Sequence, residues 1–138
     1  MRLELFKEFL VSSDSLRVYK GSKLLFSSRR DRLLPLLEYI NMFATGYTEV
    51  AVFDKVIGNA AALLCIKANC REVYSRVASQ LAIKTLDKYG IKYHFTNIVS
   101  YIKQSSSEDM CPMERLSIDK DSDEFYEIMM SKVQQLVL

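Results

Sequence analysis

Cys111 and Glu114 are the residues whose types and spacing could carry out covalent or proton-transfer chemistry. They follow a polar loop, Pro112 fixes the direction of the chain between them, and the carboxyl group lies three residues beyond the thiol. A thiol acts as a nucleophile or redox centre only when a nearby cation or helix N-terminus stabilises its thiolate. We therefore treat Cys111 and Glu114 as candidate catalytic residues, with Lys55 or Arg29 as the cation. The alternative is a packed structural loop.

A second candidate site lies at the junction between a β-branched run and an alanine-rich segment. Residues 48–53 predict a buried strand, and residues 56–69 predict a helix that follows it. In open α/β sheets ligands bind at the carboxyl ends of strands, and the free N–H groups of a helix start favour an anion. The candidate ligand-binding residues here are Asp54, Lys55, Gly58 and Asn59. Asp54 and Lys55 could instead pair with each other or with solvent, and Gly58 indicates a close contact that leaves no room for a side chain.

Ser28 and Arg29 complete the set of candidate ligand-binding residues because they precede another predicted helix, over residues 33–42. Ser28 could cap that helix, and Pro35 fits its first turn, where a missing N–H does no harm. The arginines that follow Ser28 could contact an anion. The alternative is a solvated surface.

The elements that must position these residues alternate along the chain. The remaining predicted elements are a helix over residues 3–10, strands within 16–26, 72–77 and 91–95, and helices over 80–89 and 121–138. Gly21-Ser22 is typical of a hairpin turn, Ser79 is a candidate N-cap, and residues 104–110 predict a polar loop. The alternation implies parallel strands, with the hairpin as the only antiparallel pair. We expect an α/β fold, a three-layer α-β-α sandwich around a five-stranded mixed sheet.

Composition limits the classes of protein that fit. The chain has 138 residues, 49% of them hydrophobic, which suits a single domain over residues 1–138. Its formal net charge of +2 provides no strong field for nucleic-acid binding. Its apolar runs are shorter than the ~20 residues that span a membrane, and charged residues near the start argue against a signal peptide. Three cysteines without a disulfide framework suit a reducing compartment, so we expect a cytosolic protein with free thiols.

Three phrases of the sequence carry a resemblance to a known family. FDKVIGNAAALL, VASQLAIKTLDKYGIKY and MCPME resemble the DUF1893 or TM1506-like domains, a small bacterial and archaeal family of uncharacterised proteins. The resemblance extends from about Ser15 to the final helix. The order of predicted elements is similar to that of the cytidine-deaminase-like fold. The resemblance implies this fold and assigns no activity.

The motifs of zinc deaminases are absent from the sequence. Those enzymes place a His or Cys followed by Glu at one helix start and Pro-Cys-x-x-Cys at the next. The matching positions here read Ser28-Arg29-Arg30 and Asp54-Lys55-Val56-Ile57-Gly58. His94, the only histidine, falls in a predicted strand, where we expect it to be partly buried. We expect no zinc, no other cofactor and no zinc-dependent deamination.

Two functions fit this pattern. In the first, the junction over residues 54–59, near Cys111 and Glu114, binds a small anionic or nucleotide-like molecule, and the sequence leaves open whether any reaction follows. In the second, the chain is a catalytically inactive interaction or oligomerisation module. An open pocket where Lys55, Asp54, Cys111 and Glu114 converge would favour the first, and a filled junction with an exposed apolar face would favour the second. We expect neither nucleic acid nor membrane as a partner, and a homo-oligomer is left open.

Overall fold

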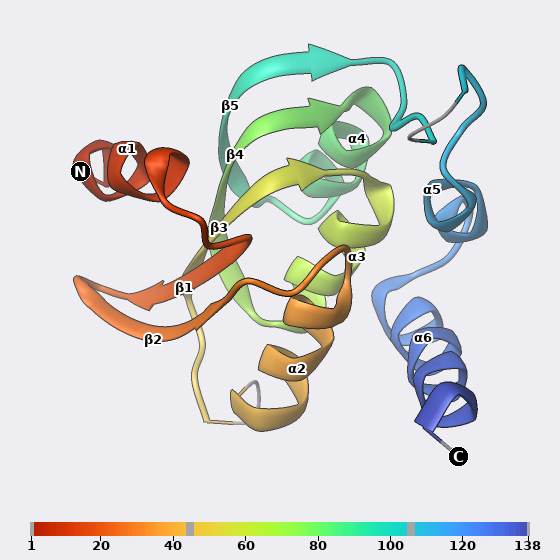
Figure 1. Ribbon diagram of the computed structural model, residues 1–138, viewed down its shortest axis with the longest axis horizontal. Helices are drawn as coiled ribbons and strands as arrows, with labels where there is room; N and C mark the ends of the chain where they lie inside the picture. The colour runs from red at the N-terminus through yellow and green to blue at the C-terminus, as the bar shows by residue number, and fades with distance from the viewer. Residues whose placement is uncertain (1, 44–45, 105–106, 138) are drawn as a thin grey trace.

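Five strands form one open mixed sheet in the computed structural model of the chain, which describes residues 2–43, 46–104 and 107–137. The strands are β1 (Leu16–Lys20), β2 (Lys23–Ser28), β3 (Val50–Ile57), β4 (Cys70–Ser79) and β5 (Lys92–Val99). Their order across the sheet is β2-β1-β3-β4-β5 (Figure 1). Two residues of the predicted polar loop, 105 and 106, and the last residue of the predicted final helix, 138, lie outside the described residues.

The pairing of the strands follows from one crossover. β3 pairs in parallel with β4, and β4 with β5, as the alternation of strands and helices predicts. β1 is antiparallel to β2 and also to β3, so the expectation of a single antiparallel pair is wrong. The reason is that the connection from β2 to β3 crosses over β1. β1 therefore lies between two strands that are both antiparallel to it.

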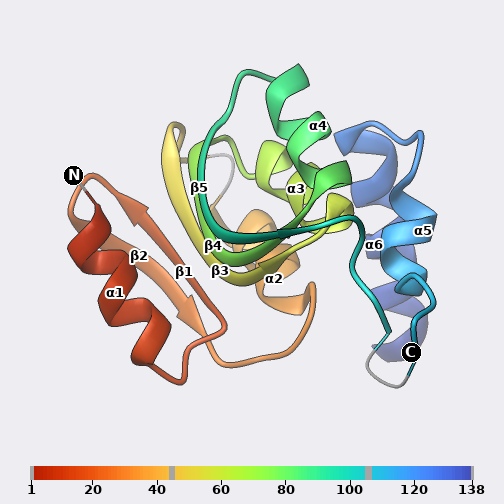
Figure 2. The same cartoon turned by 90° about the horizontal axis from the view of Figure 1, so that it is seen from above.

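Helices cover both faces of the sheet and give the predicted three layers (Figure 2). The helices are α1 (Leu3–Val11), α2 (Leu34–Phe43), α3 (Asn59–Lys67), α4 (Gln80–Lys88), α5 (Pro112–Ser117) and α6 (Ser122–Val137). α1 covers one face alone, and the other helices lie on the opposite side. None of the described helices combines the length and apolar character that crossing a membrane requires.

Each face of the sheet has its own hydrophobic core. The face under α1 is aromatic: Phe6 and Phe9 of the helix pack on Phe53, with ring centroids 5.8 and 6.0 Å apart, and Tyr74 lies 5.0 Å from Phe53. The larger core on the other face is aliphatic and includes Val52 and most of α3. α3 is buried nearly all round because its alanines allow the sheet and the neighbouring helices to approach closely.

Two elements differ from the sequence prediction in a way that matters for the site. β3 continues to Ile57 instead of ending at Phe53, because its parallel pairing with β4 extends to the pair Ile57 and Ala78. α5 was not predicted, since its six residues are too few to show a helical period.

Candidate functional site

Helices α3 and α4 start side by side at the carboxyl ends of β3 and β4, and the side chain of Glu114 from α5 fills the space between the two starts. Glu114 Oε1 accepts hydrogen bonds from the backbone N–H of Asn59, at 2.5 Å, and from Ser79 Oγ, at 3.1 Å. Glu114 Oε2 accepts a hydrogen bond from the backbone N–H of Ile102. Glu114 is only 2% exposed. Three donors face its carboxyl group, which is the arrangement an ionised carboxylate needs.

Gly58 provides the room for this carboxyl group. It is the N-cap of α3 and has an extended backbone. A Cβ atom at this position would lie 2.8 Å from Ile102 Cγ1 and 2.9 Å from Glu114 Oε1, closer than real Cβ contacts allow. The prediction that this position needs the absence of a side chain is therefore confirmed, although Gly58 precedes the helix and does not lie in its first turn.

Ser79 connects the carboxyl group to the second helix. Its hydroxyl accepts a hydrogen bond from the backbone N–H of Ala82, which confirms the predicted N-cap of α4, and donates to Glu114 Oε1. Both helix starts place partial positive charge near the carboxyl group of Glu114. The side chain thus takes the position that we expected an anionic ligand to occupy.

Asn59 extends this polar network to α5 and α4. Its Nδ2 atom donates to Ser117 Oγ at 2.9 Å and to the Ser117 carbonyl oxygen at 3.2 Å. Thr85 Oγ1 donates to Asn59 Oδ1. Asn59, Ser79, Glu114 and Ser117 are all buried, so the junction is filled by the chain itself.

Asp54 and Lys55 point to opposite faces of the sheet because side chains alternate along β3. Lys55 Nζ lies on the α1 side, where it donates to the carbonyl oxygen of Ser12 at 2.9 Å and lies 4.8 Å from the centre of the Phe9 ring. Burial and the nearby charge of Arg76 lower the pKa of Lys55. Asp54 faces the α3 side with Val52, and burial raises its pKa to about 7 even though the residue keeps some exposure. The two residues therefore do not pair with each other across the junction.

Cys111 lies near the junction but far from the cations we expected to activate it. It is the N-cap of α5, it is half-buried, and its backbone N–H donates to the carbonyl oxygen of Ile102 at 2.7 Å. Lys55 lies on the other face, and Arg29 pairs with Asp14 at 3.6 Å. The expected contact between Lys55 and Cys111 is wrong. Catalytic roles for Cys111 and Glu114 stay predictions, and the bonds that enclose Glu114 are those of a structural group.

Ser28 and Arg29 lie away from the junction. Ser28 ends β2, and its Oγ accepts a hydrogen bond from the backbone N–H of Arg30 at 3.1 Å, so it does not cap α2 as predicted. Ser28 and Asp54 both lie opposite Leu16, on the two sides of β1, which places them roughly 10 Å apart across the sheet. No group of three or more His, Cys, Asp or Glu side chains that could hold a metal ion occurs in the part of the chain that the structure describes.

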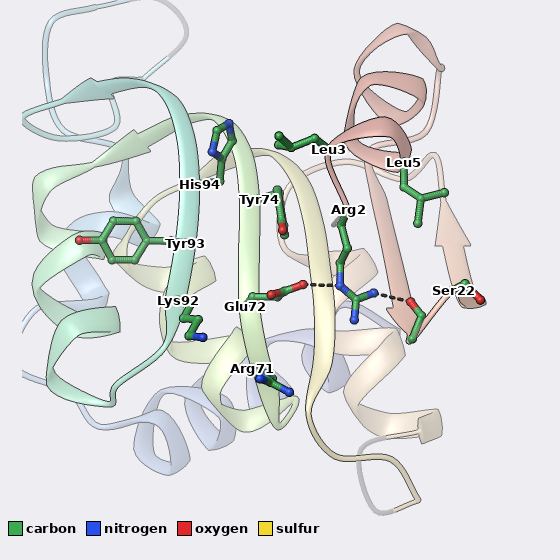
Figure 3. A pocket seen from close by; sticks show the side chains of 11 residues that line it. Arg2, Leu3, Leu5, Ser22, Arg71, Glu72, Tyr74, Lys92, Tyr93 and His94 are labelled. Carbon is green, nitrogen blue, oxygen red and sulfur yellow. Dashed lines mark hydrogen bonds and ion pairs between the residues drawn. The ribbon is translucent and has the colours of Figure 1, made fainter.

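An open groove of about 690 Å³ lies on the other face of the sheet, between α1 and the starts of β4 and β5 (Figure 3). We call it the basic groove, and it is lined among others by Arg2, Leu3, Arg71, Glu72, Lys92 and His94. Arg2 forms an ion pair with Glu72 and donates to the Gly21 carbonyl oxygen. Arg71 and Lys92 have no ion-pair partner among the described residues.

His94 contributes an exposed imidazole ring to this groove. Its centroid lies 5.8 Å from the rings of Phe6 and Tyr74. The expectation of a partly buried position is wrong, because β5 is an edge strand with little covering it. No local pattern of residues predicts the groove, since the register that places Lys92 opposite Glu72 is a property of the folded sheet.

Comparisons with known proteins agree with this fold. The family model of TM1506, a domain of unknown function (DUF1893), matches residues 5–133. The chain is similar to the crystal structure of a DUF1893 family protein (TM1506) from Thermotoga maritima, with a TM-score of 0.81 and 28% sequence identity, over 94% of this chain and 86% of that one. None of the curated proteins matches the chain.

Removing the Glu114 side chain leaves three donors without their acceptor. We expect Glu114→Ala to lower the free energy of unfolding by ~3 kcal/mol, and we expect formate to restore part of it by binding between the two helix starts. The measurement is thermal unfolding with and without sodium formate, with sodium chloride as the salt control. Glu127→Ala, at an exposed position of α6, is the matched variant. A formate effect no larger in Glu114→Ala than in Glu127→Ala would contradict the role of Glu114 as the internal anion.

Adding a methyl group at Gly58 tests the close approach. Gly58→Ala should lower the free energy of unfolding by ~2 kcal/mol, because the new Cβ displaces Ile102 and Glu114. The measurement is urea unfolding. Gly46→Ala is the control, since a Cβ there meets only the Phe43 carbonyl oxygen at an ordinary 3.7 Å. Equal effects of the two substitutions would show that the space at Gly58 is not restricted.

The raised pKa of Asp54 predicts a pH-dependent stability. Between about pH 4 and pH 7 the unfolded chain releases the Asp54 proton while the folded chain keeps it, so this residue makes folding less favourable as the pH rises. Asp54→Asn stays neutral in both states. Its free energy of unfolding relative to wild type should therefore increase by roughly 3 kcal/mol from pH 4.5 to pH 7.5. Urea unfolding at both pH values measures this, with the exposed Asp31→Asn as control. A difference that does not change with pH would refute the raised pKa.

Proposed function

This chain belongs to the DUF1893 family, and we propose that it binds a small phosphorylated molecule in the basic groove. The observation that carries the proposal is that Arg71 and Lys92, at the edge of an open concavity, form no ion pair with any of the described residues. Basic side chains that lack an internal acid are free to bind an external anion. Arginine binds phosphate through paired N–H groups, and lysine binds it as a point charge.

The charge of the groove contrasts with that of the whole chain. The chain carries a formal net charge of only +2, whereas the groove gathers Arg2, Arg71 and Lys92 against one carboxyl group, Glu72. The Arg2–Glu72 ion pair satisfies that carboxyl group and leaves the other two cations available. A concave surface with an excess of one charge raises the local concentration of a ligand of the opposite charge.

The size and the remaining walls of the groove favour a small molecule with an apolar or aromatic part. Its volume of about 690 Å³ falls within the usual range for small-ligand sites. Leu3 and Leu5 of α1 form an apolar wall, and His94 presents a ring with a polar edge. A phosphorylated, nucleotide-like molecule would use both kinds of surface, with its phosphate at Arg71 and Lys92.

The filled junction supports the choice of this groove over the site expected from the sequence. Glu114 already occupies the anion position at the helix starts, and its burial leaves no route for a second anion. We further propose that the chain acts without zinc-dependent deamination. The side chains at the two helix starts are an amide, a hydroxyl and one carboxyl group, from Asn59, Ser79 and Glu114, and the hydrogen bonds described for these groups involve no thiol or imidazole.

A second candidate function is an interaction or oligomerisation module. The same filled junction favours it, because we expected an open pocket for a ligand at that site and a closed one for a module. Binding in the basic groove and association of chains are compatible, since β5 lines the groove through side chains while its backbone edge stays free.

Titration calorimetry with three probes tests the proposal: inorganic phosphate, a nucleoside monophosphate and the corresponding nucleoside. We expect binding of the monophosphate, weaker binding of phosphate and none of the nucleoside. Arg71→Glu and Lys92→Glu should each reduce the affinity for the monophosphate by at least about 10-fold. Lys84→Glu, an exposed position of α4 on the opposite face, makes the same change in charge and should bind like wild type. No binding by wild type, or equal losses in all three variants, would refute the basic groove as the site.

A further inference from the structure

Strand β5 is an edge of the sheet and has a free backbone side. It pairs only with β4, and no other backbone hydrogen bond involves its residues among the described parts of the chain. All of its eight residues except Phe95 are exposed. An edge strand of this length presents a row of N–H and C=O groups that can template another strand.

This edge lacks the devices that usually prevent such pairing. Lys92 is the only lysine, arginine, aspartate or glutamate in β5, the strand contains no proline, and its register with β4 runs without a shift from Lys92 to Val99. The opposite edge is different. There, β2 pairs with β1 through a register shift between Val18 and Tyr19, and a bulge of this kind distorts an edge and disfavours pairing.

Exposed apolar side chains gather at the same edge. The structure has nine large hydrophobic residues with substantial exposure among those it describes, and four of them belong to β5 or to the turn that leads into it. These four are Tyr89, Tyr93, Ile98 and Val99. Ile98 is 54% exposed. A free backbone edge flanked by apolar side chains is typical of a surface that a partner covers.

We propose that the partner is a second copy of this chain, paired antiparallel through β5 across a twofold axis perpendicular to the sheet. With this axis, residues that lie directly opposite each other have their side chains on the same face of the joined sheet. Because side chains alternate along a strand, two opposite residues must therefore be both even-numbered or both odd-numbered. A register centred on Thr96 satisfies this and places Tyr93 opposite Val99, an aromatic and β-branched pair that stabilises neighbouring strands. It also keeps the two copies of Lys92 at opposite ends of the interface.

In this register the Tyr93–Val99 contact occurs twice, once on each side of the axis, and Lys92 lies opposite no charged residue, and these are the observations that favour a second copy over an unrelated strand. Pairing would join the two sheets into one continuous sheet. The basic grooves would stay open, because each lies on the α1 face, between α1 and the beginnings of β4 and β5. The inference is therefore independent of the proposed ligand.

Opposite charges introduced at Thr96 test the pairing. Thr96 is exposed and lies at the proposed axis, so Thr96→Asp places two carboxylates against each other and Thr96→Lys places two ammonium groups there. The measurement is sedimentation equilibrium over a range of concentrations. We expect a wild-type dimer, at least about 10-fold weaker association of each variant alone, and recovery of the dimer when the two variants are mixed in equal amounts.

Two controls keep the test decisive. Leu24→Asp and Leu24→Lys introduce the same charges at an exposed position of the β2 edge and should leave the dimer intact. Circular dichroism and thermal unfolding verify that every variant folds. A wild-type chain that remains monomeric at all concentrations would overturn the proposal. So would a dimer whose association is unchanged by the charges at Thr96, or one that dissociates when the charges are introduced at Leu24.

Discussion

A single buried carboxyl group, that of Glu114, joins segments that are far apart in the sequence. Its oxygens accept hydrogen bonds from the starts of α3 and α4 and from the segment after β5, through Asn59, Ser79 and Ile102. A carboxyl group in the interior is costly unless its lone pairs and its charge are met, and two helix starts meet both. The position of α5, and of the chain that leads to it, follows from this requirement. Gly58 completes the arrangement because its lack of a side chain lets the carboxyl group reach the backbone of α3.

Because Glu114 fills the junction at the carboxyl ends of the strands, the molecule must bind ligands or partners at other parts of its surface. In open α/β sheets the carboxyl ends of the strands are the usual ligand site, but here the chain supplies the anion itself. The free cations are found at the other ends of the strands and on the other face, where Arg71 and Lys92 flank the basic groove beside α1. The edge strand β5 borders that groove and also leaves the sheet open to extension. The proposed ligand site and the proposed contact between copies thus both lie outside the junction that resembles a ligand site.

The order of the elements could be predicted from the sequence because periodicity, caps and turn residues are local signals. The need for space at Gly58 could be predicted for the same reason. Its partner could not, since Glu114 lies 55 positions beyond Asn59 and belongs to a helix too short to show a period. The side-chain direction of Lys55 was misjudged because two charged residues suggested the end of a strand, whereas β3 continues and alternation directs Lys55 towards α1. The basic groove depends on the register between strands, which no local pattern of residues specifies.

A double-mutant cycle between Ser79 and Glu114 tests the central role of the buried carboxyl group most directly. Urea unfolding of wild type, Ser79→Ala, Glu114→Ala and the double variant separates their mutual interaction from the loss of the α4 cap, which is common to both Ser79→Ala proteins. The hydrogen bond between the two side chains predicts a coupling free energy of at least about 1 kcal/mol in favour of the native pair. A coupling within about 0.3 kcal/mol of zero would show that Glu114 does not hold the two helix starts together.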